Sequence, residues 1–175
     1  MAKISQRQVV AKVISLTGMG GSDETLNQFT STTRPYFSQV SGGEVQASVE
    51  KVYDGGSTFP EVLPSVIEVG DVTVTRHYDP GVDAALISTY RNKVGRKYFR
   101  VEIITLDADG TQTGYTRKYE NCILVNITEP DGDASSGGPA TFSLTFAVSK
   151  STDASYVAPP ANPGTTTATA GTATT

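Results

Sequence analysis

The stretch GDVTVTRHYDPGVDAALISTYRNKVGRK, residues 70–97, places two kinds of periodicity back to back. In its first half Val72 and Val74 alternate with polar residues, which predicts a half-buried strand. Asp79 and Pro80 then favour the start of a helix, because aspartate is a common N-cap and proline suits the first helical position. Four apolar residues follow at the spacing of one helix face: Val82, Ala85, Leu86 and Tyr90. We therefore expect a strand that turns directly into a helix over about residues 80–92.

Outward from this corner the chain is predicted to be mainly β. Residues 141–149 show the clearest alternation, with four apolar side chains expected to point inward: Phe142, Leu144, Phe146 and Val148. Residues 43–53 alternate in the same way, which predicts a second half-buried strand. Strands are also expected over 97–106 and 111–128, with a turn at Asp107–Gly110 and a bend near Gly114 or Asn121. The pattern predicts an antiparallel β-sandwich or barrel of about six strands with one flanking α-helix.

The length and composition favour one folded domain and a tail. Residues 1–156 are predicted to form a single β domain with long flexible loops at about 18–35 and 54–66. Residues 157–175 are expected to be a disordered tail, because 17 of these 19 residues are Thr, Ala, Pro or Gly and none is charged.

Charge and cysteine content exclude several function classes. The net charge of −4 provides no overall basic character for holding a nucleic-acid backbone. A single cysteine, Cys122, excludes an intrachain disulfide and a thiolate metal cluster, and a small buried side chain is the simplest interpretation of it. No apolar run approaches membrane-spanning length, and the N-terminus, with three basic residues spread through it, lacks the pattern of a signal peptide.

The candidate catalytic and ligand-binding residues each have a simpler structural interpretation. His77, the only histidine, lies near Asp79, but no nucleophile motif or second histidine accompanies it. Asp107 and Asp109 resemble the opening of a calcium loop but lack the later glutamate, so a hairpin turn is preferred. The basic residues over 91–100 favour a solvated helix end or a salt-bridging subunit contact over a phosphate site. We expect no catalytic residues, no cofactor and no metal.

The polar faces of three predicted strands lack lysine and arginine. Ordinary solvent-facing strands mix both signs of charge and often carry lysine. The eleven residues of these faces are Glu44, Gln46, Ser48, Glu50, Asp71, Thr73, Thr75, Thr141, Ser143, Thr145 and Ser149. Such a surface would not hold a polyanion.

Two long segments resemble the tail tube proteins of bacteriophages. YFSQVSGGEVQASVEKVYDGG (36–56) and LPSVIEVGDVTVTRHYDPGVDAALISTYRN (63–92) follow the family's order of strand, long loop, G-D-V-T-V-x-R strand and helix. GRKYFRVEIITLDADGTQTGYTRKYENC (95–122) looks like the strand pair that comes next in the family. The resemblance covers roughly residues 36–150, and the order and spacing of the segments carry it. It departs from the family at His77, where the family usually has a glycine.

The resemblance implies a structural subunit that assembles into stacked six-fold rings, related to the tubes of contractile tails, bacteriocin tails and type VI secretion systems. The eleven polar residues then become candidates for the lumen through which double-stranded DNA passes without specific binding. Candidates for the contact between rings lie in the 54–66 loop: Asp54, Gly55, Gly56, Phe59, Pro60 and Leu63. Implied partners are further copies of the chain and tail terminator, tape-measure and baseplate or tip proteins. The implied location is the virion tail, assembled in the host cytoplasm without membrane insertion of the subunit.

Two other functions stay open from the sequence. A monomeric β-sandwich could serve as an adhesion or tail-decoration module, binding through the 54–66 or 130–139 loop. A hydrolase using His77 and Asp79 is the third hypothesis.

Overall fold

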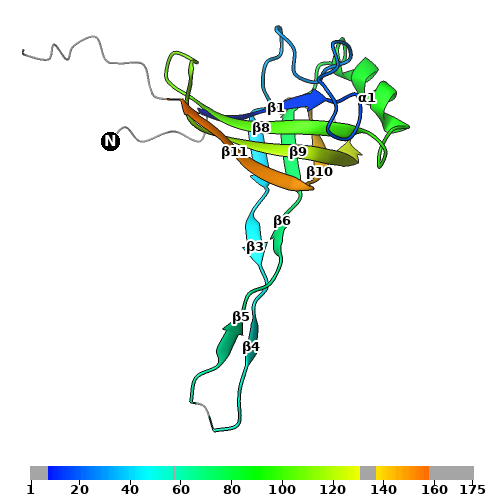
Figure 1. Ribbon diagram of the computed structural model, residues 1–175. Coiled ribbons are helices and arrows are strands. Elements are labelled where there is room, and N and C mark those ends of the chain that lie inside the picture. Colours follow the sequence, from blue (N-terminus) through cyan, green and yellow to red (C-terminus); the bar gives the residue numbers. More distant parts are fainter. Residues whose placement is uncertain (1–7, 57, 131–136, 158–175) are drawn as a thin grey trace, which may run out of the picture.

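The computed structural model describes residues 8–56, 58–130 and 137–157, which contain eleven strands and one α-helix (Figure 1). The elements up to the helix are β1 (Val9–Ser15), β2 (Gln39–Gly42), β3 (Val45–Ala47), β4 (Glu50–Val52), β5 (Glu61–Leu63), β6 (Ile67–Val69) and β7 (Val72–His77). They are followed by α1 (Asp83–Arg91), β8 (Tyr98–Leu106), β9 (Gln112–Thr128), β10 (Thr141–Ala147) and β11 (Lys150–Val157). The tail expected at 157–175 lies outside the described residues from 158 onward.

Seven strands form one curled antiparallel sheet in the order β1-β8-β9-β10-β7-β2, with β11 also paired to β9. The strand β9 is long enough to pair with β11 through its first half and with β10 through its second half. It contains positive φ angles at Gly114 and Asn121, the two positions where a bend was predicted. A bridge between Ala11 and Phe37 brings β1 close to the segment that enters β2, so the sheet curls into a half-barrel. The predicted fold class, a mainly β antiparallel fold with one flanking helix, is confirmed.

The core lies between the inner face of this sheet, α1 and the loop before β2. The alternation predicted for β10 is confirmed, because Phe142, Leu144 and Phe146 are all buried. Phe29 enters the same core from the 18–35 loop, and its ring centroid lies 5.1 Å from that of Tyr90 on α1 and 6.1 Å from that of Phe99 on β8. The loop is therefore fastened to the body by a large aromatic side chain.

The helix begins later than predicted. The Asp79 carboxylate accepts a hydrogen bond from the Gly81 amide at 2.9 Å, the contact expected of an N-cap, but the regular helix starts only at Asp83. The buried face is also shifted: Leu86 and Tyr90 are buried as predicted, whereas Val82 and Ala85 are exposed and Ile87 and Asp83 take their places. Apolar spacing alone did not reveal that an aspartate would be buried.

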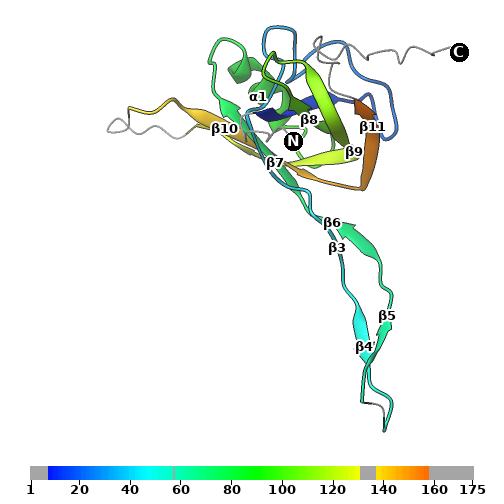
Figure 2. The ribbon, with the colours of Figure 1, turned by 90° about the vertical axis from the view of Figure 1, so that its left-hand side faces the viewer.

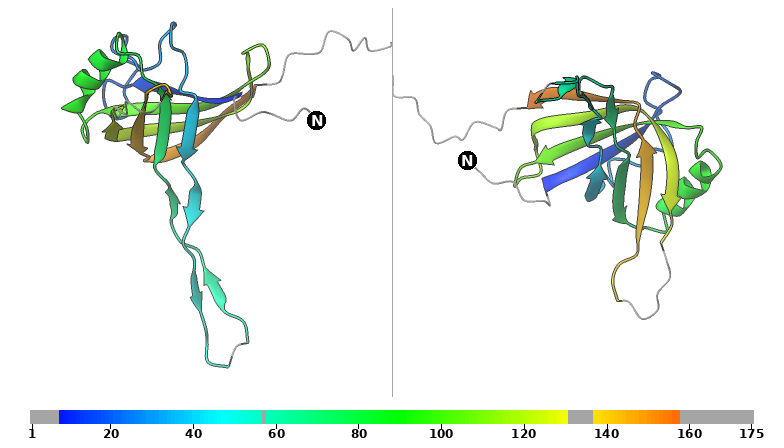
Figure 3. Two further views of the ribbon diagram at one scale, coloured as in Figure 1. Left: turned by 180° about the vertical axis from the view of Figure 1, so that it is seen from behind. Right: turned by 90° about the horizontal axis from the view of Figure 1, so that it is seen from below.

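Residues 43–56 and 58–70 form an arm that projects from the body, as Figure 2 and the left-hand view of Figure 3 show. The arm consists of two successive two-stranded ribbons, β3 with β6 and β4 with β5. The prediction of one half-buried strand over 43–53 was wrong, because this segment is split into β3 and β4 and Val45, Ala47 and Val49 are exposed. A ribbon of two strands has no second layer against which to bury an apolar face.

Candidate functional site

The outer face of β7 and β10 presents a row of hydroxyl groups. Thr73 is paired with Thr145, and Thr75 with Ser143, because the two strands are antiparallel neighbours. The side-chain oxygens of Thr73 and Thr145 lie 3.1 Å apart, within hydrogen-bond distance. Val72, Val74, Leu144 and Phe146 alternate with these residues and are buried, which fixes the hydroxyl groups on the opposite face of the sheet.

The two flanking strands extend this surface. Ser41 of β2 lies opposite Thr73, and Asn126 of β9 lies opposite Thr145. The same pairing continues in the next row with Gln39 and Thr128. We call this surface the hydroxyl face; its nine members are Gln39, Ser41, Thr73, Thr75, Asn126, Thr128, Thr141, Ser143 and Thr145. All nine are uncharged at neutral pH. The exposed His77 is paired with Thr141 and borders this face.

The rest of the outer sheet surface has a different character. Toward β8 and β1 it carries Lys12, Arg100, Glu102 and Lys118. Glu102 accepts a hydrogen bond from Arg100 at 2.9 Å and lies 3.8 Å from the Lys118 ammonium. One continuous sheet is thus uncharged on one half of its outer surface and rich in ion pairs on the other.

The eleven polar residues predicted for the lumen do not share one surface in the chain. Five of them lie on the hydroxyl face: Thr73, Thr75, Thr141, Ser143 and Thr145. Glu44, Gln46, Ser48 and Glu50 lie on the arm, and Asp71 and Ser149 lie exposed just outside β7 and β10. The hydroxyl face also contains Gln39, Ser41, Asn126 and Thr128, which sequence reasoning missed because their positions depend on strand register.

The predicted inter-ring residues lie on the far half of the arm. Asp54, Gly55, Gly56, Phe59 and Pro60 belong to the connection between β4 and β5, and Leu63 ends β5. Phe59 is 81 % exposed and Tyr53 is 67 % exposed in the single chain. Large apolar side chains at this level of exposure, gathered on one slender element, are typical of an interaction site.

The arm joins the body through two glycines that no other residue could replace without strain. Gly42 and Gly43 have φ angles of +82° and +74°, in the region that favours glycine. A Cβ on Gly43 would lie 2.4 Å from the Tyr119 hydroxyl oxygen. That hydroxyl donates a buried hydrogen bond of 3.0 Å to the Gly43 carbonyl, and the Gly43 amide donates one of 3.1 Å to the Asp71 carbonyl. The arm root is therefore closely packed and fully tied to the sheet.

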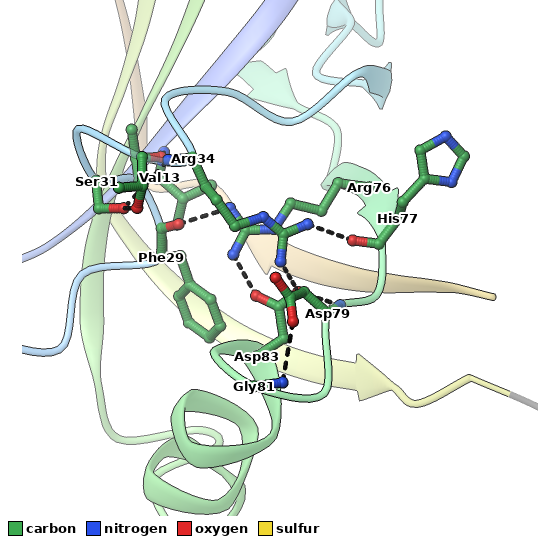
Figure 4. A network of polar contacts seen from close by, with 11 residues as sticks. Val13, Phe29, Ser31, Arg34, Arg76, His77, Asp79, Gly81 and Asp83 are labelled. Carbon is green, nitrogen blue, oxygen red and sulfur yellow. Dashed lines mark hydrogen bonds and ion pairs between the residues drawn. The ribbon is translucent and has the colours of Figure 1, made fainter. Parts of the chain in front are cut away.

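At the other end of β7 an unexpected ionic cluster holds the strand–helix corner (Figure 4). Arg76, 3 % exposed, donates to Asp83 at 2.5 Å and to the Phe29 carbonyl at 2.6 Å. Arg34 also pairs with Asp83 and donates to the His77 carbonyl at 2.5 Å. Burial lowers the pKa of the Arg76 guanidinium, and the hydrogen bond to Asp83 opposes that shift. The corner joins β7, α1 and the 18–35 loop through charged groups with little solvent access.

His77 does not take part in this cluster through its side chain. Its ring is exposed and points away from Asp79 and Asp83 (Figure 4).

Within the described part of the chain no three His, Cys, Asp or Glu side chains are arranged to hold a metal ion. Asp107 accepts hydrogen bonds from the amides of Asp109 and Thr111, so the predicted hairpin turn is confirmed.

Cys122 is a buried side chain, as predicted. Burial raises the pKa of its thiol to about 12, and its Sγ lies 3.2 Å from the Tyr119 carbonyl oxygen. In the ranges described, no helix combines the length and apolar character needed to cross a bilayer.

Comparison with solved structures identifies proteins of the same shape. A chain of the PVC sheath/tube terminator, from an extracellular contractile injection system, superposes with a TM-score of 0.67 at 16% identity, covering 89% of this chain and 99% of its own. A chain of the anti-feeding prophage cap, which terminates the tube, gives a TM-score of 0.64 at 16% identity, over 88% of this chain and 92% of its own. The SPP1 tail tube gives 0.52 at 14% identity, over 89% of this chain and 81% of its own. The chain has the fold of tail tube proteins. No protein-family model and no curated protein matches its sequence.

Proposed function

We propose that the protein is a structural subunit of a phage tail tube, forming stacked six-fold rings whose lumen conducts double-stranded DNA. The hydroxyl face carries the proposal: it spans four adjacent strands, contains no lysine or arginine, and belongs to a fold shared with tail tube proteins. Cationic side chains on a DNA-conducting surface would bind phosphates and release counterions at each ring. Hydroxyl and amide groups form hydrogen bonds with water and with DNA about equally well. DNA that passes such a surface is therefore not held in place.

The arm supplies the contact between successive rings in this proposal. Its exposed apolar side chains would become buried when a second copy lies against them, and burial of apolar area is the main favourable term in association. The four arm residues Glu44, Gln46, Ser48 and Glu50 then belong to the joint between rings or to the lumen wall beside it. Terminator, tape-measure and baseplate or tip proteins are the partners expected at the ends and inside such a tube, and the virion tail is its expected location.

Electron microscopy of the purified protein tests the proposal. We expect hollow tubes or stacked rings with six-fold end views at high protein concentration. A chain that stays monomeric at every concentration would contradict the tube and favour the alternative, a monomeric binding or decoration module that uses the arm on another partner.

The protein needs no catalytic group for this role. A hydrolase built on His77 and Asp79 is the competing hypothesis from the sequence. We expect His77→Ala to leave tube formation and infectivity unchanged, because the imidazole is exposed and directed away from the ionic cluster. Loss of infectivity with normal tubes would favour the hydrolase.

A further inference from the structure

Exposed apolar side chains are concentrated at two places in the described chain. The arm carries nine of the thirteen large hydrophobic residues that are exposed: Val45, Val49, Val52, Tyr53, Phe59, Val62, Leu63, Val66 and Ile67. Three others, Met19, Leu26 and Val82, lie in the loop after β1 or at the start of α1, and the last is Val125 at the β9 bulge. Apart from the arm, three of the four exposed apolar residues thus belong to the loop after β1 or to the start of α1.

These two places lie at opposite ends of β7. The arm joins the start of β7 at Gly70, and α1 begins six residues after the last residue of β7 (Figure 2). The loop over 17–27 is held beside α1, because the Tyr90 hydroxyl donates to the Asn27 carbonyl at 2.7 Å and Lys97 pairs with Glu24. Two different surfaces at opposite ends of one strand are suited to a head-to-tail contact. In such a contact one surface of a subunit meets the other surface of the next subunit, so the same contact can be repeated along a stack.

A groove of about 370 Å³ lies between this loop and the end of α1. We call it the loop–helix groove; it is lined by Thr17, Asp23, Glu24, Thr25, Leu26, Asn27, Tyr90 and Lys93. Its two carboxylates form salt bridges, Asp23 with Arg100 and Glu24 with Lys97. The Lys93 ammonium lies over the Tyr90 ring, 5.7 Å from its centroid. Neither Lys93 nor the exposed Arg96 forms a salt bridge with a carboxylate of the described residues. The groove therefore combines one exposed apolar side chain, Leu26, with the positive charge of Lys93 and the nearby Arg96; the Glu24 carboxylate also attracts Lys93.

The arm has the complementary composition. Between residues 43 and 70 it carries five carboxylates and one lysine: Glu44, Glu50, Asp54, Glu61, Glu68 and Lys51. We propose that the loop–helix groove of one subunit receives the arm of a second copy in the next ring, with arm apolar groups on the exposed Leu26 and arm carboxylates facing Lys93 and Arg96. This rests on the proposed tube function and names the surface on which the arm docks. Complementary charge of this kind selects the partner and its register more than it adds affinity.

Cross-linking between two different variants tests the contact directly. Thr58→Cys places a thiol at the arm tip and Thr25→Cys places one at the groove; Cys122 does not interfere because it is fully buried. We expect a short bismaleimide to produce covalent dimers when the two variants are co-assembled, and only monomers from either variant alone. Thr111→Cys, in the exposed β8–β9 turn, replaces Thr25→Cys as the control and should give none. Tubes that form without the Thr58–Thr25 product would overturn the proposal.

Charge reversal provides a second test. Single rings that still form show that the variant chain folds, so a loss of tubes can be assigned to the contact between rings. Lys93→Glu with Arg96→Glu should shorten tubes at least tenfold while single rings remain, and Glu50→Lys with Glu61→Lys in the same chain should restore their length. The control variant combines Arg91→Glu with Glu129→Arg, which swaps the two residues of an exposed ion pair. This pair lies beside a separate groove between α1 and the end of β9. Tubes of normal length in the first variant, or loss of tubes in the control alone, would place the arm elsewhere. Absence of tubes from the unaltered chain would instead contradict the tube function itself.

Discussion

At the scale of single residues, the strand–helix corner depends on Asp83. This fully buried carboxylate accepts hydrogen bonds from Arg76, from Arg34 and from the backbone amide of Asp79. Two guanidinium groups share it, so its removal leaves a buried positive charge without a counterion. Such a charge is costly because the interior cannot replace its lost hydration.

We expect Asp83→Asn to lower the free energy of unfolding by about 3–5 kcal/mol, the cost usually observed when one partner of a buried ion pair is removed. Urea unfolding of the single chain measures this. The matched control is Glu129→Gln, which breaks an exposed ion pair with Arg91 and should cost about 0–1 kcal/mol. Equal losses in the two variants would contradict a structural role for the buried cluster.

The signal for this cluster was present in the sequence. The alternation that places Val72 and Val74 inward places Arg76 inward as well, and a buried arginine needs a carboxylate. Asp83 could not be chosen from the sequence because the turn at 79–82, which sets the face that α1 buries, depends on tertiary contacts. From the sequence His77 was the candidate catalytic residue at this corner, but the adjacent Arg76 forms the buried bonds to Asp83 and Phe29.

Cys122 is expected to make the free energy of unfolding decrease as the pH rises in the alkaline range. Its thiol pKa is raised to about 12 from an ordinary value of 9.0, so between these values the unfolded chain loses the proton and the folded chain keeps it. Unfolding is then favoured as the pH rises, by up to about 1.4 kcal/mol per pH unit from this group. The contribution is fully present below about pH 9 and is lost as the pH approaches 12. We expect the stability of Cys122→Ala to fall less steeply than that of the unaltered protein between pH 9 and 11, measured by urea unfolding. Parallel curves would contradict the assignment.

At the scale of elements, the arm root controls how the arm leaves the body. Gly43 packs against Tyr119 with no room for a side chain, whereas Gly56 at the far end of the arm has φ +97° and no atom near its Cβ position. At both positions an alanine would have to adopt a left-handed backbone conformation, which costs about 1–2 kcal/mol. The two substitutions therefore differ mainly in whether the added methyl group meets other atoms.

We expect Gly43→Ala to destabilise the chain by about 1–3 kcal/mol more than Gly56→Ala, because a methyl group must displace the Tyr119 ring. Denaturant unfolding of both variants gives the difference. Gly43→Ala should also prevent tube growth, since a shifted Tyr119 redirects the arm. Equal stability of the two variants would show that the root is not closely packed in solution.

The elements differ in how far the sequence determined them. The strand over 141–149 was predicted correctly because its apolar face meets a core made by the same chain. The strand over 43–53 was not, although it alternates as clearly. Alternation shows that a strand has one apolar face to bury. It does not show whether that face is buried by the same chain or by another one. Val45, Ala47 and Val49 satisfy the pattern, and nothing in the described chain covers them.

At the scale of the whole molecule, the hydroxyl face is expected to govern DNA transit and not folding. Thr73→Lys and Ser143→Lys should leave tube assembly largely intact, because both side chains lie on the outer face of the sheet. They should slow DNA delivery, because each ring would then attract the phosphate backbone. Single-particle ejection rates and infectivity measure the effect, which should weaken as salt is raised.

Thr73→Gln and Ser143→Gln are the matched controls for side-chain length without charge. They should deliver DNA at close to the normal rate. Normal infectivity with both lysines present would mean that this face does not line the channel.

The arm and the loop–helix groove lie at opposite ends of β7. Each subunit has a projection at one end and a recess at the other, so a stack joined through them has a head and a tail of different chemistry. If the rings are six-fold, as proposed above, the first ring would leave six recesses empty and the last ring would leave six arms uncovered. Growth would then proceed differently at the two ends, and whatever starts the filament could not be the same protein that stops it.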